Sequence, residues 1–353
     1  MSIENNLAIR VQGSLGIISL DRIQHLNALT LPMIQGIQAQ LDQWCHDQEV
    51  QAILINSNSP KAFCAGGDIR YLYDNYQAGN TQYQDFFATE YTMLSMLRNF
   101  PKVVIVLMDG YVLGGGFGLA QACHIKVSSE KSRFAMPETA IGFFPDVGAT
   151  HFLSRLDEVG VYMALTGEQI SSSDALYLDL VDYHVPSECF AELEAALIAA
   201  PVLNPIEIQK IISSYITYPV ESELQKRVDP INQHFGYPNL DEIEQSLEHA
   251  SSATDQEWAN KMLAILQQRP VMAKQTSLKL QQAGQNLSLE KCMQLERDLQ
   301  DIWLEQGDFI EGVRALIIDK DKNPQWRTEN AKFEKTLQKI WPAWTQQRIE
   351  NIT

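Results

Sequence analysis

The sequence lacks several patterns that would assign it to a definite class. Its five cysteines are scattered without a CxxC pair, and its seven histidines show no metal-ligand spacing such as HxxxH. Even one of the longest apolar runs, residues 103–108 (VVIVLM), falls far short of the roughly 20 residues that a membrane-spanning helix needs. These absences speak against a disulfide framework, a structural zinc site and a membrane span. We expect no metal, no membrane partner and a reducing compartment.

Positive charge is also scarce. The chain has 27 Lys and Arg against 44 Asp and Glu, which gives a formal net charge of −17. Such a surface repels phosphodiester backbones, so nucleic acid is not an expected partner.

The first ten residues contain neither a long apolar run nor the Arg- and Ser-rich composition of a transit peptide. We therefore expect a cytoplasmic protein.

Hydrophobic residues make up 45% of the 353-residue chain, which is enough to bury a large core. Short apolar runs predict strands, and apolar residues at helical spacing predict helices between them, an alternation typical of an α/β fold. From about residue 201 strand patterns disappear, so we predict domains at 1–200 and 201–353. The expected strands are 7–11, 15–20, 52–55, 103–108 and 125–128; the expected helices are 31–46, 86–99, 204–214, 240–249, 255–267 and 289–305.

Two glycine-rich loops each follow an apolar strand, at residues 65–68 (AGGD) and 114–118 (GGGFG). Glycine lets the backbone approach a ligand closely, and a loop that enters a helix N-terminus adds a positive dipole end. One N–H group from each loop would together form an oxyanion hole for a carbonyl. Taken alone, each loop also fits a simple tight turn.

A third segment, residues 134–148 (FAMPETAIGFFPDVG), carries two acids in apolar and glycine-rich surroundings. Acidic residues are rarely buried without a partner or a task, and an apolar setting can adapt a carboxyl group to acid–base work. Glu138 and Asp146 are therefore candidate catalytic residues. The structural alternatives are a first-turn helix acid for Glu138 and a turn or cap residue for Asp146.

These segments, in this order, resemble the crotonase (enoyl-CoA hydratase/isomerase) superfamily. Residues 26–29 (LNAL), 61–70 (KAFCAGGDIR) and 109–118 match its early signature and its two oxyanion loops, and residues 165–182 match its LTG…DA…LVD segment. The resemblance implies a crotonase-like fold of repeated β-β-α units, with an extended helical C-terminal part. It also implies that the backbone N–H groups of Gly67 and Gly115 are the oxyanion donors.

Within the superfamily, the chain resembles the 3-hydroxyisobutyryl-CoA hydrolases. Hydratases of this fold use a second glutamate at the position where this chain has Gly118. The hydrolases instead have Glu and Asp at the positions that match Glu138 and Asp146 of this chain. Residues 308–315 (DFIEGVRA) and 319–326 resemble the hydrolase ending. The substrate-site residues implied by the resemblance are Glu90, Gly66, Asp68 and Gly114, although Glu90 also fits a solvated helix acid.

Coenzyme A is negatively charged, so its binding to this acidic chain requires a local cationic patch. Relatives usually have Arg-Pro-Lys before the LNAL motif, but this chain has Arg22, Ile23 and Gln24, so an expected lysine near the CoA phosphates is absent. Arg22 and Lys61 are the remaining candidates for CoA binding. We expect no cofactor, because coenzyme A is part of the substrate.

The resemblance implies hydrolysis of a short 3-hydroxyacyl-CoA thioester, with Glu138 acting as a general base or as a nucleophile. The substrate named by the resemblance is 3-hydroxyisobutyryl-CoA, an intermediate of valine degradation. The alternatives are an enoyl-CoA hydratase or isomerase and a non-catalytic acyl-CoA-binding protein. Cys64 is a thiol-nucleophile candidate, but we expect it to be a buried packing residue. The superfamily also suggests a homo-oligomer, such as a trimer.

Overall fold

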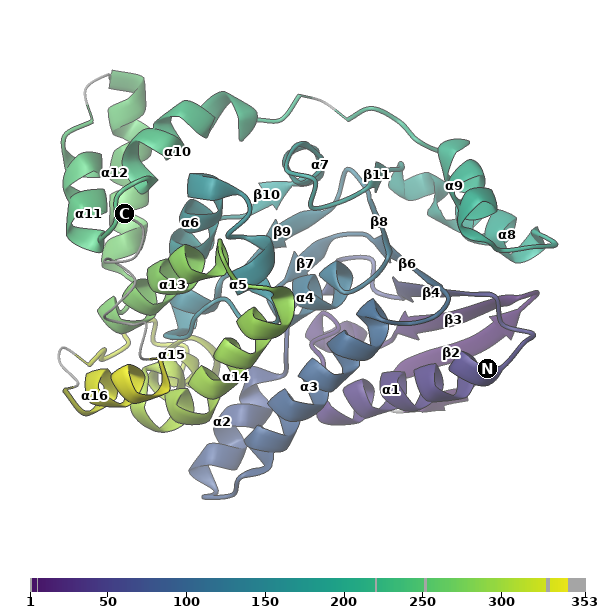
Figure 1. The fold of residues 1–353 in the computed structure, drawn as a ribbon, viewed down its shortest axis with the longest axis horizontal. Helices are drawn as coiled ribbons and strands as arrows, with labels where there is room; N and C mark the ends of the chain where they lie inside the picture. Colours follow the sequence, from purple (N-terminus) through teal and green to yellow (C-terminus); the bar gives the residue numbers. More distant parts are fainter. Residues whose placement is uncertain (1, 5, 220, 251–252, 328–330, 342–353) are drawn as a thin grey trace. The chain divides into compact units, whose positions relative to one another are not determined.

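The computed structural model describes residues 2–4, 6–219, 221–250, 253–327 and 331–341 (Figure 1). Two compact units are interleaved along the chain. Unit 1 consists of Met1–Asp68, Ala88–Ala135 and Gln169–Lys226; unit 2 consists of Ile69–Phe87, Met136–Glu168 and Arg227–Thr353. The composition change near residue 201 had predicted contiguous domains at 1–200 and 201–353. The units differ from that division because helices from residues 136–168 pack against the C-terminal helices, for example α6 against α13.

The larger sheet of unit 1 has the strand order β1-β2-β3-β4-β6-β8-β11. β3, β4, β6 and β8 run parallel, whereas β2 pairs antiparallel with β3. The β6 run is apolar throughout because a parallel strand is covered on both faces. The strands are β1 (Ser2–Glu4), β2 (Leu7–Gln12), β3 (Leu15–Leu20), β4 (Ala52–Ser57), β6 (Val103–Met108), β8 (Ile125–Ser128) and β11 (Tyr183–His184).

A smaller sheet in the same unit positions both glycine loops. Its strand order is β10-β9-β7-β5, and β5, β7 and β9 run parallel to one another. The carboxyl ends of parallel strands meet at one edge of a sheet. At this edge β5 leads into the first glycine loop, β7 leads into the second, and β9 leads into Met136. The strands are β5 (Ala62–Cys64), β7 (Tyr111–Leu113), β9 (Arg133–Ala135) and β10 (Ile170–Ser171).

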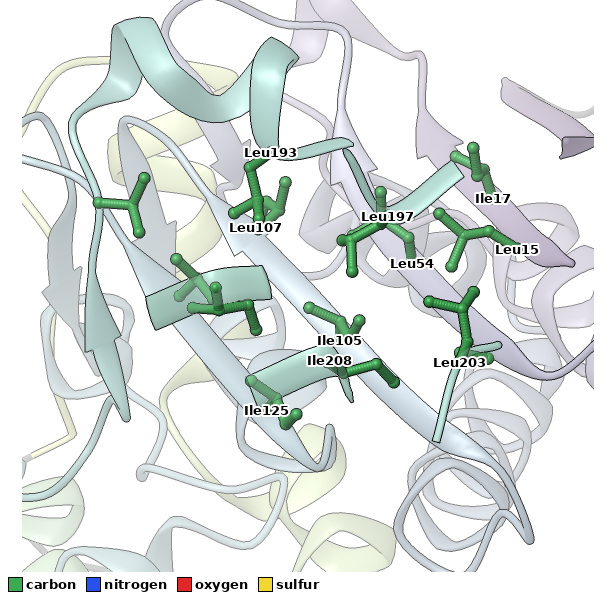
Figure 2. Packing of buried hydrophobic residues seen from close by; sticks show 14 residues of the cluster. Leu15, Ile17, Leu54, Ile105, Leu107, Ile125, Leu193, Leu197, Leu203 and Ile208 are labelled. Atoms are coloured by element: carbon green, nitrogen blue, oxygen red, sulfur yellow. The ribbon is translucent and has the colours of Figure 1, made fainter. Parts of the chain in front are cut away.

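Helices α8 and α9 pack on one face of the larger sheet. Leu193 and Leu197 from α8 and Ile208 from α9 are fully buried with strand residues such as Leu54 and Ile105 (Figure 2). The helical elements of unit 1 are η1 (Ile23–His25), α1 (Leu31–His46), α3 (Gln82–Arg98), α4 (Gly115–Gln121), α7 (Ser172–Tyr177), η3 (Ser187–Cys189), α8 (Phe190–Ala199), α9 (Pro205–Ser213) and η4 (Gln225–Arg227). Two of them cross into unit 2, since α3 begins there and η4 ends there.

Unit 2 is helical in its described residues. α6 packs against α10 and α13, and α14 packs against α5, α15 and α16. None of the described helices is long and apolar enough to cross a membrane. The elements are α2 (Ile69–Gln77), η2 (Glu138–Ile141), α5 (Ala149–Phe152), α6 (Asp157–Thr166), α10 (Val228–Phe235), α11 (Leu240–Glu248), α12 (Ala253–Gln267), α13 (Val271–Gly284), α14 (Leu289–Gln306), α15 (Phe309–Val313), η5 (Arg314–Ile318) and α16 (Ala331–Ile340).

Candidate active site

The first glycine loop is held against the LNAL segment. The Leu29 N–H donates to the Gly66 carbonyl at 2.8 Å, and the Asp68 N–H donates to the Leu29 carbonyl at 2.8 Å. This is a parallel bridge between Leu29 and Gly67, in which the partners of Leu29 are the residues on either side of Gly67. The N–H group of Gly67 therefore points away from Leu29. Gly66 has a φ of +107°, a conformation that other residues rarely adopt.

The second glycine loop begins a helix. The Gly114 N–H donates to the Ala135 carbonyl at the end of β9, at 3.0 Å. Gly114 is the N-cap of α4, so Gly115 occupies the first helical position. The first N–H groups of a helix have no intrahelical partner and lie at the positive end of its dipole. The Gly115 N–H is thus available to an acceptor outside the helix.

The two loops converge within unit 1. A Cβ atom added at Gly115 would lie 3.3 Å from the amide nitrogen of Gly67. A Cβ atom added at Gly66 would lie 3.8 Å from the amide nitrogen of Gly115. The structure thus brings together the two amide groups that the sequence selected as oxyanion donors. A side chain at position 115 would intrude where they meet.

Glu90 lies beside this pair of loops. It belongs to α3, and only 2% of its surface is exposed. Its Oε1 atom lies 2.9 Å from the position that a Cβ atom of Gly115 would occupy. The solvated-acid alternative for Glu90 is therefore wrong, because the carboxylate is buried against the second glycine loop. Its role toward a substrate stays a prediction.

The two cations predicted to bind coenzyme A have different surroundings. The Arg22 guanidinium donates to the Ala28 carbonyl at 3.1 Å and pairs with the Asp68 carboxylate at 2.8 Å. Arg22 therefore ties the LNAL segment to the first glycine loop. Lys61 is exposed and directly precedes β5. Neither position has been tested for CoA binding, which stays a prediction for both residues.

Cys64 is buried at the end of β5. Its thiol donates to the Asn27 carbonyl at 3.1 Å, and a Cβ atom at Gly116 would come within 2.8 Å of its sulfur. Burial raises the pKa of this thiol to about 12, and the negative charge of Glu90 adds to the effect. A thiol with so high a pKa is a poor nucleophile near neutral pH. These surroundings favour the packing role.

The two acids of the third segment both lie in unit 2, and both are buried. Glu138 opens the short helix η2 after Pro137 and is 8% exposed, while Asp146 is 6% exposed. The segment between them is aromatic: Phe143 stacks on Phe144 with ring centroids 4.4 Å apart. The apolar setting predicted for the two carboxyl groups is present. Their catalytic roles stay predictions.

Helix α14 supplies partners that the sequence reasoning missed. The Gln300 side chain donates to Oδ2 of Asp146 at 2.6 Å, and the Trp303 indole donates to the Gly142 carbonyl at 2.7 Å. Both residues are fully buried. Gln300 lies 154 residues from Asp146 in sequence, so no local motif marks the contact. The sequence did contain one indication of this contact. Gln300 is a polar residue on the otherwise apolar face of the helix expected at residues 289–305.

Comparison with known proteins identifies the family. A family model described as enoyl-CoA hydratase/isomerase matches residues 15–339, which is most of the chain. The chain belongs to this family.

The described residues contain no group of three or more His, Cys, Asp or Glu residues placed to hold a metal ion.

Full-length relatives support the family assignment and refine it. The chain is 38% identical over 329 residues to a chicken (Gallus gallus) protein named 3-hydroxyisobutyryl-CoA hydrolase, mitochondrial, covering 91% of this chain and 84% of the relative. It is 36% identical over 324 residues to the Xenopus laevis protein of the same name, covering 90% and 83%. The resemblance to 3-hydroxyisobutyryl-CoA hydrolases is confirmed.

The fold prediction is also confirmed. A crystal structure described as an enoyl-CoA hydratase from Rhodobacter sphaeroides 2.4.1 superposes with a TM-score of 0.85. It shares 34% identity and covers 95% of this chain and 97% of its own. The chain thus has the crotonase-like α/β fold, with an extended helical C-terminal part.

Proposed function

We propose that this protein hydrolyses a short 3-hydroxyacyl-CoA thioester, with 3-hydroxyisobutyryl-CoA as the preferred substrate. The products are 3-hydroxyisobutyrate and free coenzyme A, a step of valine degradation. The similarity to proteins named 3-hydroxyisobutyryl-CoA hydrolase over nine-tenths of the chain supports this choice. The enzyme uses no cofactor, since coenzyme A enters as part of the substrate.

The observation that carries the proposal is the convergence of the Gly67 and Gly115 amides. A thioester carbonyl oxygen placed on these two N–H groups gains negative charge when its carbon is attacked. Fixed amide donors stabilise that charge more in the transition state than in the ground state. A Cβ atom at Gly115 would lie 3.3 Å from the Gly67 amide nitrogen, so the lack of a side chain at this position keeps that donor accessible.

Chain connectivity supports the assignment of Glu138 to the same reaction. β5, β7 and β9 run parallel, and Leu113 at the end of β7 pairs with Ala135 at the end of β9. Only two residues separate Ala135 from Glu138. Glu138 thus follows in sequence, by three residues, the strand end whose carbonyl accepts the Gly114 N–H.

In the proposed reaction, Glu138 follows one of two routes. As a general base it takes a proton from water, whose oxygen attacks the thioester carbon; as a nucleophile its carboxylate attacks that carbon to form an anhydride, which water then opens. In both routes the carbon–sulfur bond breaks and the thiolate leaves with a proton. Asp146 positions the acyl hydroxyl or the water, or assists proton transfer to the thiolate.

The rival activity is hydration of an enoyl-CoA on the same fold. The structural match to a protein described as an enoyl-CoA hydratase keeps this alternative in view. Hydration in this fold uses a pair of glutamates, and this chain has Gly118 at the position of the second. With one acid of the pair absent, hydrolysis is the better-supported reaction. A non-catalytic binder would gain little from keeping Glu138 and Asp146 buried.

A thiol-release assay tests the proposal. Purified protein is incubated with 3-hydroxyisobutyryl-CoA, 3-hydroxypropionyl-CoA and acetyl-CoA, and free CoA is measured with a thiol reagent. A parallel assay follows the loss of enoyl absorbance with crotonyl-CoA. We expect catalytic thiol release that is fastest with a 3-hydroxyacyl ester and no hydration of crotonyl-CoA. Rapid hydration without thiol release would instead establish the hydratase, and stoichiometric binding without turnover would establish the binder.

A further inference from the structure

Three buried polar side chains lie along one face of helix α14 in unit 2. Glu296, Gln300 and Trp303 are spaced at i, i+4 and i+7, the repeat that places residues on one side of a helix. Each is 0% exposed. Glutamate and glutamine are rarely buried completely unless their polar atoms have a specific use. We call these three residues the α14 row.

Glu296 binds the backbone that follows Asp146. Its Oε2 atom accepts the Gly148 N–H at 2.8 Å, and its Oε1 atom accepts the Thr150 N–H at 2.9 Å. These N–H groups belong to the N-cap and to the first turn of the short helix α5. A carboxylate at this place also meets the positive end of the local peptide dipoles. Glu296 thus fixes the backbone at the start of α5, directly after Val147.

The backbone fixed by Glu296 is strained. Val147 has a φ of +52°, and Gly148 follows at +90°. A positive φ is a genuine outlier for a β-branched residue such as valine, because its side chain crowds the backbone. Conformations of this kind persist only where the surroundings impose them, and they cluster at functional sites. Val147 directly follows Asp146 in sequence. The backbone conformation at Val147 therefore helps to set the direction in which the Asp146 side chain leaves the backbone.

Gln300 acts on the carboxylate itself. Its amide nitrogen donates to Oδ2 of Asp146 at 2.6 Å, while its amide oxygen accepts from Arg297 at 3.1 Å. The contact with Arg297 gives the amide one preferred orientation, with its NH₂ group toward Asp146. Trp303 completes the row by donating to the Gly142 carbonyl at 2.7 Å. The row therefore holds the Glu138–Asp146 segment at the backbone and at one side chain.

We propose that Glu296 and Gln300 are positioning residues for Asp146 in the hydrolytic reaction. Glu296 imposes the strained turn at Val147, and Gln300 orients the Asp146 carboxylate. This inference rests on the proposed function. A purely structural role for the row explains the capping of α5, but it does not require an amide directed at the Asp146 carboxylate.

Gln300→Leu tests the orientation of Asp146. Leucine is one atom shorter than glutamine and suits a buried site, but it cannot donate to the carboxylate. We expect kcat for thiol release to fall about 10- to 100-fold, with KM within about twofold of wild type. Gln294→Leu, on an exposed position of the same helix, is the matched control and should change neither.

A double-mutant cycle separates positioning from general destabilisation. If Gln300 acts through Asp146, adding Gln300→Leu to Asp146→Ala should lower kcat by no more than about twofold beyond the single variant. Full additivity of the two losses would overturn the role of Gln300. Circular dichroism and the thermal midpoint of each variant show that the comparison is made between folded proteins.

Glu296→Gln tests the strained turn without relying on activity. Glutamine has the shape of glutamate, but its NH₂ group cannot accept a hydrogen bond. One of the two backbone N–H donors, of Gly148 or of Thr150, therefore loses its acceptor. We expect hydrogen exchange at the amides of Gly148 and Thr150 to accelerate about 10-fold or more in the folded variant. Glu305→Gln, on an exposed position of α14, is the control and should leave both rates unchanged.

The two experiments distinguish the inference from the proposed function. Absence of thiol release by the wild-type protein would count against the function, while the exchange rates would still show whether Glu296 fixes the turn. An active wild-type protein whose Gln300→Leu and Glu296→Gln variants keep wild-type kcat and exchange rates would overturn the inference alone.

Discussion

At Gly115, the space for a side chain is limited on two sides. A Cβ atom there would lie 2.9 Å from Oε1 of Glu90 and 3.3 Å from the Gly67 amide nitrogen. The first contact involves the end of a side chain that can move, whereas the second involves the backbone that would bind the thioester oxygen. A methyl group at this position should therefore disturb the oxyanion donors more than it disturbs the packing of the fold.

We predict that Gly115→Ala stays folded and lowers kcat for thiol release by about 10²-fold, the scale of losing one oxyanion donor. Gly79→Ala is the control. Its Cβ atom would meet nothing within 4 Å, although its φ of +70° will cost about 1–2 kcal/mol of stability. Steady-state kinetics and thermal unfolding of both variants check this. A Gly115→Ala enzyme with normal turnover would contradict the assignment of the oxyanion hole.

Cys64 is predicted to be dispensable for the chemistry. With a pKa raised to about 12 by burial, only about one molecule in 10⁴ carries the thiolate at pH 8. Cys64→Ser retains a donor for the Asn27 carbonyl, so we expect turnover within about threefold of wild type. The same burial should protect Cys64 from iodoacetamide in the native state, as measured by mass spectrometry. A folded Cys64→Ser variant without activity would reopen the thiol mechanism.

Single residues could be selected from the sequence where a local motif marked them. The two glycine loops, LNAL and the Met-Pro-Glu segment are each contiguous, so their identity was readable before their geometry was known. Gln300 and Glu296 were missed because their partners lie about 150 residues away in sequence, at Asp146 and Gly148. The contacts of Arg22 with Asp68 and Ala28 were not predicted either, and its role in CoA binding stays a prediction.

At the scale of elements, regular periodicity decided which helices and strands were predicted. Strands 15–20, 103–108 and 125–128 and helix 31–46 have the predicted bounds, because each has either a continuous apolar run or a clear amphipathic pattern. Helix α6 was missed because it is buried from Val159 to Thr166 and has no polar stripe along that stretch. The extent of such burial depends on packing partners in unit 2, which periodicity does not reveal.

Asp174 illustrates an element held by one carboxylate. It lies in α7, where it completes a capping box with Ser171 and accepts the Leu224 N–H at 2.9 Å and the Ser222 hydroxyl at 2.7 Å. Burial alone would raise the pKa of Asp174, but these hydrogen bonds outweigh it and hold the pKa below its ordinary value of 3.8. The carboxylate thus joins α7 to residues 222–224.

We predict that Asp174→Asn lowers the free energy of unfolding by about 2 kcal/mol near neutral pH, because backbone and hydroxyl donors lose their charged acceptor. A depressed folded-state pKa gives a stabilisation that is present above the ordinary pKa and lost as pH falls through the folded value. The difference between wild type and variant should therefore shrink below about pH 4 in urea titrations. Asp42→Asn, exposed on α1, is the control. A difference that grows on acidification would contradict this account.

At the scale of the whole molecule, the charge of −17 limits the partners of the chain. We predict that the protein shows no binding to a fluorescent DNA duplex at physiological salt, up to about 100 µM protein, because the mean field repels the phosphates. Fluorescence anisotropy checks this, with a basic DNA-binding protein as the positive control. Saturable binding at micromolar protein would show that a local basic surface overcomes the net charge.

The candidate residues are distributed over both compact units of the chain. Gly67, Gly115 and Glu90 belong to unit 1, and Glu138 and Asp146 belong to unit 2. Location and oligomeric state stay predictions: the relatives compared above are named as mitochondrial proteins, whereas the sequence of this chain led us to expect the cytoplasm and a homo-oligomer.

The most direct test of the account is kcat for CoA release from 3-hydroxyisobutyryl-CoA by Glu138→Gln. The change keeps the shape of the side chain and removes its capacity to accept a proton or attack the carbonyl. We predict a loss of about 10²–10⁴-fold in kcat with an unchanged thermal midpoint, while Glu248→Gln, exposed on α11, keeps wild-type turnover. A folded Glu138→Gln enzyme that releases CoA at the wild-type rate would contradict the proposed chemistry.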